Sequence, residues 1–180
     1  MNEGLIPRRY AKALYKVAVE RKVDERVYVL MQTLVSSFDN TSGLQGVVSN
    51  PFVRQYQKEK IIITPVGAGA ADTTFADFLK MLAHNKRIDM VNEIAHAYVD
   101  IYRQQRNIRK VEVVSAAPLD SAVLGRITSL VERHLHGATM EFTTTVDPAL
   151  IGGFVINVDN QRLDASVSNQ LKELRQSLLN

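Results

Sequence analysis

The spacing of apolar residues changes near residue 107, and this change limits the fold more than any other feature of the sequence. Before it, apolar residues recur every three or four positions, as in residues 27–38, whereas after it they alternate with polar residues, as in residues 139–146. The first spacing puts side chains on one face of a helix, and the second puts them on one face of a strand. The sequence therefore predicts a mainly α chain, with a bundle of five or six helices over residues 1–106 and a small α+β domain over residues 107–180.

The second of these domains has the pattern of roughly four strands and two helices. Alternation of apolar and polar residues predicts the strands, and a recurring apolar stripe predicts the helices. The clearest predicted elements are strands at 111–115, 140–146 and 154–158, and helices at 119–136 and 167–178. A hairpin tip is expected at 159–161, because the chain continues with Leu163 beyond it.

A turn is predicted where Asp147 and Pro148 follow the second of these strands. Asp at the first position and Pro at the second are favourable in a β-turn. Gly152 and Gly153 come just before the next strand, where glycine permits a positive φ or a bulge. We therefore interpret Asp147, Gly152 and Gly153 as residues that specify the fold and not as a phosphate site.

Composition and charge exclude several classes of protein. The chain has no cysteine, which removes disulfides, thiolate metal sites and cysteine nucleophiles. No stretch reaches the ~18 apolar residues of a membrane span, and we expect neither membrane insertion nor a secretory signal. Lys and Arg number 15 against 11 Asp and Glu in residues 1–107, and 7 against 8 in residues 108–180. This mild, scattered basic charge leaves a nucleic-acid-binding adaptor as an alternative but does not favour it.

The sequence motifs do not indicate an enzyme, a cofactor or a metal. Gly67 and Gly69 are not followed by the Gly-Lys-Ser/Thr of a phosphate-binding loop. His134 and His136 are two residues apart on a predicted helix, so they point about 200° apart and do not readily share a metal ion. No serine occupies a Gly-x-Ser-x-Gly elbow. We predict no catalytic residue and expect residues 65–71 to form a loop between helices.

Two predicted helices have unusually wide apolar faces. At ~100° per residue counted from Tyr10, the apolar arc of the first helix, which has Pro7 in its first turn, spans roughly 240°. The arc of the helix at 75–84 spans roughly 220°. A helix that packs on one side needs an arc only a little over ~100° wide. Either both helices are buried on two sides, or their second faces receive a helix of another protein. Tyr10, Ala13 and Val17 on the first helix border its polar sector, as do Phe78 and Met81 on the second.

Several segments, taken in order, resemble one known family along essentially the whole chain. The strongest is the segment Met140–Ile156, in which Asp147-Pro148 and Gly152-Gly153 lie between two alternating strands. The chain resembles the delta subunit of the bacterial F-type ATP synthase, the equivalent of the mitochondrial oligomycin-sensitivity-conferring protein. The other matching segments are Arg9-Tyr-Ala-Lys-Ala-Leu14, Asn50-Pro51, Phe78-Leu79 to Asn85-x-Arg87, Val114-Ser-Ala116 and Asp164-x-Ser-Val167.

The resemblance implies a six-helix N-terminal bundle, an α+β C-terminal domain and a non-catalytic stator role. Such a subunit links the catalytic head to the peripheral stalk and resists rotor torque during ATP synthesis. The groove between its first and fifth helices would bind the N-terminal helix of an alpha subunit, and its C-terminal domain would meet the C-terminal end of a b subunit. A peripheral place on the cytoplasmic face of a bacterial inner membrane is implied too. The residues expected to face the alpha helix are Tyr10, Ala13, Leu14, Val17, Phe78, Met81 and Leu82.

Overall fold

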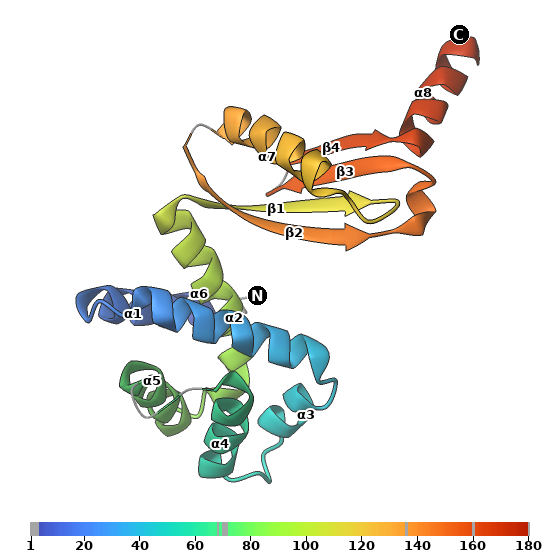
Figure 1. Ribbon diagram of the computed structural model, residues 1–180. Helices are drawn as coiled ribbons and strands as arrows, with labels where there is room; N and C mark the ends of the chain where they lie inside the picture. The colour runs from blue at the N-terminus through green and yellow to red at the C-terminus, as the bar shows by residue number, and fades with distance from the viewer. Residues whose placement is uncertain (1–3, 68, 70–71, 136, 160, 180) are drawn as a thin grey trace. The chain divides into compact units, whose positions relative to one another are not determined.

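The computed structural model divides the chain into two compact units (Figure 1). The first unit ends at Arg103 and the second begins at Gln104, where the sequence predicted a division after Arg106. The structure describes residues 4–67, 69, 72–135, 137–159 and 161–179. The chain is mainly helical, with one small sheet in its C-terminal part.

Helices make up the described part of the first unit. The helix α6 continues past the division of the chain and ends at Arg106. A short 3-10 turn, η1, precedes α6. The elements are α1 (Leu5–Glu20), α2 (Asp24–Asn40), α3 (Leu44–Ser49), α4 (Gln55–Val66), α5 (Thr73–His84), η1 (Ile88–Met90) and α6 (Val91–Arg106).

Pro65 lies inside α4, although the sequence predicted a loop between helices over residues 65–71. The helix ends at Val66, and the next residue, Gly67, has the left-handed conformation (φ 65°) common at helix C-termini. The amide of Gly67 donates a hydrogen bond to the carbonyl of Ile63 at 3.2 Å, and this bond closes the last turn. The expected loop therefore begins at Gly67, and Ala68, Ala70 and Ala71 lie outside the described residues.

Aromatic contacts join α1, α2 and α6 inside the first unit. The Tyr15 ring meets the rings of Tyr98 and Tyr102 edge to face, with centroids 6.2 and 6.3 Å apart. The Tyr98 hydroxyl donates a hydrogen bond to the backbone carbonyl of Asp24 at 3.3 Å. Burial raises the pKa of Tyr98 far above its ordinary range, so this hydroxyl stays a donor. These contacts place α6 beside the C-terminal half of α1 and the start of α2.

A four-stranded sheet with the order β2-β1-β3-β4 forms the centre of the second unit. Strand β1 pairs in parallel with β2, and a crossover through α7 connects the two. Strand β3 pairs antiparallel with both β1 and β4. The elements are β1 (Ile108–Ser115), α7 (Ser121–Leu135), β2 (Thr139–Val146), η2 (Pro148–Leu150), β3 (Gly153–Val158), β4 (Gln161–Ser166) and α8 (Val167–Leu179).

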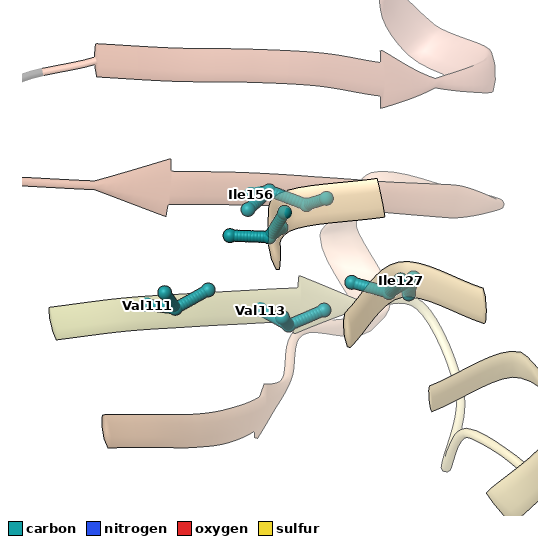
Figure 2. Packing of buried hydrophobic residues seen from close by; sticks show 5 residues of the cluster. Val111, Val113, Ile127 and Ile156 are labelled. Carbon is teal, nitrogen blue, oxygen red and sulfur yellow. The ribbon is translucent and has the colours of Figure 1, made fainter. Parts of the chain in front are cut away.

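The core of the second unit lies between α7 and the two central strands (Figure 2). Ile127 and Val131 of α7 form one buried cluster with Val111 and Val113 of β1 and Ile156 of β3. A helix is about 10 Å wide and strands are about 4.8 Å apart, so one helix covers about two strands. On the same face, Met140 of β2 packs partly buried against this core. Farther from α7, the outer strands keep exposed apolar side chains, namely Phe142 and Val146 of β2 and Leu163 of β4.

Candidate functional site: a groove between α1 and α5

A hollow of about 420 Å³ lies in the first unit between the N-terminal half of α1 and the C-terminal end of α5. One wall comes from α1, and the other comes from α5 and the residues that follow it. The lining residues are Ile6, Arg9, Tyr10, Ala13, Met81 and Arg87. The structure thus places an accessible groove between the first and fifth helices.

Two parallel stripes on α1 explain why this helix has such a wide apolar face. Pro7, Ala11, Leu14 and Ala18 are buried inside the unit. The residues one position earlier, Ile6, Tyr10, Ala13 and Val17, repeat the same spacing and stay half-buried or exposed. One residue corresponds to about 100° on a helix, so the second stripe lies beside the first. The first stripe is part of the core. In the second stripe, Ile6, Tyr10 and Ala13 line the groove, and Val17 lies one turn beyond Ala13 on the same face of the helix.

The large apolar side chains of α5 are buried in the unit, except for one exposed residue at the edge of the buried face. Phe75, Phe78, Leu79 and Leu82 are buried, whereas Met81 is 39% exposed. Methionine is flexible and polarisable, and it adapts to the shape of a partner. Met81 is therefore the apolar contact that α5 offers to the groove.

Hydrogen bonds at its N-terminal end fix α5 against α1 and α2. Arg21 donates to the hydroxyl of Thr74 at 3.2 Å. Arg26 donates two hydrogen bonds of 2.9 Å to the carboxylate of Asp72, which also accepts one from the amide of Gly69. These donors hold the pKa of Asp72 below its ordinary value, with the Arg26 bond as the largest cause. Bidentate pairing of this kind fixes geometry as well as adding energy.

The seven residues expected to face a partner helix fall into two groups. Tyr10, Ala13 and Met81 line the groove, and Val17, 37% exposed, continues the α1 stripe. Leu14, Phe78 and Leu82 are buried in the unit and contribute to its core. A helical wheel gives the width of an apolar arc, but it does not show which part of that arc the neighbouring helices cover. The sequence pattern alone therefore does not distinguish the groove residues from the core residues.

Sequence reasoning missed three groove residues. Ile6, Arg9 and Arg87 line the hollow. Arg9 and Arg87 lie in two of the segments that match the family. The width of an apolar helix face does not indicate charged residues, so this pattern could not predict them. Ile6 could have been found, because it precedes Tyr10 by four residues and belongs to the same stripe.

The turn between β2 and β3 is built around Asp147. Its carboxylate accepts a hydrogen bond from the amide of Ala149 at 2.9 Å, and its own amide donates to the carbonyl of Ser115 at 2.8 Å. The first bond starts the 3-10 turn η2, and the second ties this turn to the end of β1. Asp147 thus acts on the backbone of the turn.

The two glycines that follow the turn lie where β3, β4 and α8 meet. The amide of Val167, the first residue of α8, donates to the carbonyl of Gly152 at 3.0 Å. A Cβ at Gly152 would lie 2.9 Å from Cγ2 of Val167. Gly153 has φ +77°, and a Cβ there would lie 3.1 Å from Cα of Ser166. Both positions therefore lack space for a side chain.

A second hollow, of about 430 Å³, lies in the C-terminal unit beside α7. It occupies the face of the sheet that α7 leaves uncovered on the β4 side. Its walls are mainly apolar and include Leu163, which is 52% exposed. The lining residues are Leu130, Val131, Ile156, Val158, Gln161, Arg162 and Leu163.

Within the described residues, no group of three or more His, Asp or Glu side chains could hold a metal ion. His136 lies outside these residues. Among the same residues, no helix is both long enough and apolar enough to cross a membrane.

The chain combines a helical unit that carries an accessible groove with a small sheet unit that carries a second hollow, a two-part mainly α architecture. Comparison with protein families gives the particular class. A model of the family described as ATP synthase delta (OSCP) subunit matches residues 6–178. The chain belongs to this family, whose members are non-catalytic subunits of the F-type ATP synthase complex.

Individual relatives agree with this result along their whole length. The chain is 36% identical over 180 residues to ATP synthase subunit delta of Bacteroides fragilis, covering 99% of this chain and 96% of that one. It is 34% identical over 176 residues to the subunit of Phocaeicola vulgatus, covering 98% and 95%. A chain in the mitochondrial ATP synthase hexamer of Toxoplasma gondii has the same fold, with a TM-score of 0.71, 24% identity and 97% of each chain covered.

Proposed function

We propose that this chain is a stator subunit that links the catalytic head of the ATP synthase to its peripheral stalk and resists rotor torque. Family membership supports the complex, and the α1–α5 groove supports the contact with the head. In this proposal α1 to α6 act as one six-helix bundle, and the protein is peripheral on the cytoplasmic face of a bacterial inner membrane.

The occupant of the groove in this proposal is the N-terminal helix of an alpha subunit. The observation that carries it is the exposed second stripe of α1, with Tyr10, Ala13 and Val17, facing Met81 of α5 or continuing the line of the groove. An amphipathic helix binds such a groove through apolar residues spaced at i, i+3, i+4 and i+7. Small Ala13 leaves room for close approach of the two helix backbones.

The mechanical task agrees with the finding that the sequence contains no recognisable catalytic motif. Torque from the rotor acts on the whole catalytic head, and a stator must hold that head still. Such a task needs slowly dissociating contacts, and dissociation rates depend on a few well-packed residues. Two separate apolar hollows, one in each unit, offer two such contacts.

The C-terminal unit is the proposed partner of the b subunit's C-terminal end. Its supporting features are the hollow beside α7 and the apolar start of α8. Leu163 lines the hollow, and Val167 and Leu171 on α8 are exposed four residues apart. A helix from the b subunit could cover part of the apolar surface that α7 leaves open.

Titration of an alpha-subunit peptide into the full-length chain tests the first contact. The peptide holds the first ~20 residues of the alpha subunit, a length of about 30 Å as a helix. We expect saturable one-to-one binding by calorimetry. An equally long duplex DNA or RNA is the comparison. No peptide binding, together with tight and salt-sensitive nucleic-acid binding, would favour a nucleic-acid adaptor instead.

Substitution of Leu163 by Asp tests the second contact. The variant places a charge in the hollow, and capture of a C-terminal b-subunit fragment should fall at least ~10-fold. Ile151→Asp is the matched control, because Ile151 is an exposed residue at the opposite end of the β3–β4 pair. If both variants capture the fragment as well as the unmodified chain does, the b subunit does not use this hollow.

A further inference from the structure

We infer that the helix bound in the α1–α5 groove presents carboxylates to Arg9 and Arg87, so that the partner is an acidic amphipathic helix and not a purely apolar one. This inference rests on the proposed function and adds the charge of the partner to it. The two arginines line the groove from its two walls, Arg9 from α1 and Arg87 from the segment after α5.

Arg9 lies on α1 between the residues that form the groove stripe. It comes three residues after Ile6 and four before Ala13, and its side chain is exposed. Residues three and four apart are neighbours on a helix surface. A helix that covers Ile6 and Ala13 therefore passes directly beside the Arg9 guanidinium.

Arg87 has a fixed backbone position on the opposite wall. Its amide donates a hydrogen bond to the carbonyl of Leu82 at 2.8 Å, directly after Lys86, which has φ 54°. This bond closes the end of α5, and the Arg87 side chain is half-buried beside the hollow. The charge is thus held close to the groove by the backbone.

Arg9 and Arg87 have no ion-pair partner within the part of the chain that the structure describes. The described residues that line the groove include no Asp or Glu. Asp77 of α5 is 3.8 Å from Arg21 and belongs to that pair. The exposed ionisable residues of α1 and α5 include Lys12, Lys16 and Lys80 as well as Glu20 and Asp77.

Covering the groove with an uncharged helix would therefore carry a cost. Apolar contact with Tyr10, Ala13 and Met81 removes water from around two guanidinium groups, and a desolvated charge without a partner is unfavourable. A carboxylate at each edge of the occupant's apolar stripe removes this cost and adds attraction at long range. Charges at both edges also fix how the helix is rotated in the groove.

The test uses the full-length chain and two peptides from the first ~20 residues of the alpha subunit. One peptide has the natural sequence, and in the other every Asp and Glu is replaced by Asn and Gln. Dissociation constants are measured by calorimetry at about 0.01 M and about 1 M salt, where charges are screened beyond ~30 Å and ~3 Å. The chain variants are Arg9→Gln and Arg87→Gln, with Arg8→Gln as the control.

Arg8 is a matched control because it is an exposed arginine on α1 that does not line the groove. At low salt we expect Arg9→Gln and Arg87→Gln each to weaken binding of the natural peptide about 3–5-fold, with Arg8→Gln within two-fold of the unmodified chain. The differences should shrink at high salt. The uncharged peptide should bind less tightly and should not distinguish the variants.

Two unfavourable results are distinguishable. If the natural and the uncharged peptide bind equally well and the arginine variants change nothing, the groove is an apolar site and the charge inference is wrong, while the proposed function stands. If neither peptide binds the unmodified chain, the proposed contact with the alpha subunit is wrong and the inference falls with it. Thermal melts of the variants, expected to match the unmodified chain, confirm that each one is folded.

Discussion

A side chain at Gly153 would collide with the backbone carbonyl of Ala165 on the neighbouring strand β4. The two strands approach closely where β3 begins, and Gly153 pairs with Ser166 in the register of the sheet. The φ of Gly153 is +77°, a region that other residues adopt only with strain. Two separate physical constraints therefore require glycine at this position.

Replacement of Gly153 by Val should unfold or strongly destabilise the C-terminal unit. The strained φ costs ~1–3 kcal/mol, and displacement of β4 adds to it, so we expect a loss of at least ~2 kcal/mol. Chemical denaturation followed by circular dichroism measures this loss. Binding of the alpha-subunit peptide should persist, because the groove belongs to the other unit.

Gly125→Ala is the matched control for that substitution. Gly125 lies within α7, and a Cβ there would meet no atom within 4 Å. Alanine has a higher helix propensity than glycine, so this variant should gain about 0.5–1 kcal/mol of stability. A Gly153→Val variant that denatures like the unmodified chain would show that the glycine turn is not required by the fold.

The exposed position of Ala13 gives a sharp test of the groove. Ala13→Asp places a charge where a bound helix would exclude water, and we expect a binding loss of at least ~2 kcal/mol, about 30-fold in Kd. The free protein should lose less than ~1 kcal/mol, since the site is exposed to solvent without a partner. Peptide titration and thermal melts of the same variant measure the two effects.

Val19→Asp provides the control on the same helix. Val19 is also an exposed apolar residue of α1, but six residues place it well away from Ala13 around the helix. It should leave peptide binding within about two-fold of the unmodified chain. If Ala13→Asp binds equally well, no partner helix occupies this groove, and if it fails to fold, this face of α1 belongs to the core.

The sequence predicted helices and strands well where the periodic spacing of apolar residues is clear. The spacing of Val27, Leu30 and Leu34 predicts α2, and the strict alternation through Phe142 predicts β2, both of which the structure contains. These patterns depend only on the local period of a helix or strand. The chain is mainly helical with a C-terminal sheet, as expected, because the two periods occupy different parts of the sequence.

Burial could not be predicted where it depends on neighbouring elements. Phe142 and Val146 alternate like core residues, yet both are exposed because β2 is an edge strand. The alternation of apolar and polar residues predicts a strand, but it does not predict the position of that strand in the sheet. The same reason applies to Ala13 and Leu14, which share one apolar arc but lie on opposite sides of the boundary between surface and core.

The Asp72–Arg26 pair predicts a dependence of stability on pH. The Asp72 side chain is 7% exposed, and its pKa lies below the ordinary value of 3.8 because Arg26 donates to its charged form. The pair therefore stabilises the fold fully above the ordinary pKa, and this contribution disappears as the pH falls through the lowered pKa. Asp72→Asn should lower the melting temperature at pH 7, and its difference from the unmodified chain should become small near pH ~2.

Asp77→Asn is the control for this effect. Asp77 pairs with Arg21 at 3.8 Å, and both side chains are exposed, so this pair should contribute little at any pH. Thermal melts of the three proteins between pH 2 and 7 make the comparison. An equal difference between Asp72→Asn and the unmodified chain at both ends of this range would mean that the carboxylate charge is not what stabilises the pair.

Limited trypsin digestion should separate the two units. Residues 104–107 are exposed in a row at the end of α6, and Arg106, Arg109 and Lys110 offer cleavage sites there. The first unit has its own aromatic and aliphatic core, so a fragment ending near residue 106 should stay helical and bind the alpha-subunit peptide. Mass spectrometry of the early products identifies the cut. Early cleavage inside α1 to α5, without a resistant N-terminal fragment, would show that the two units do not fold independently.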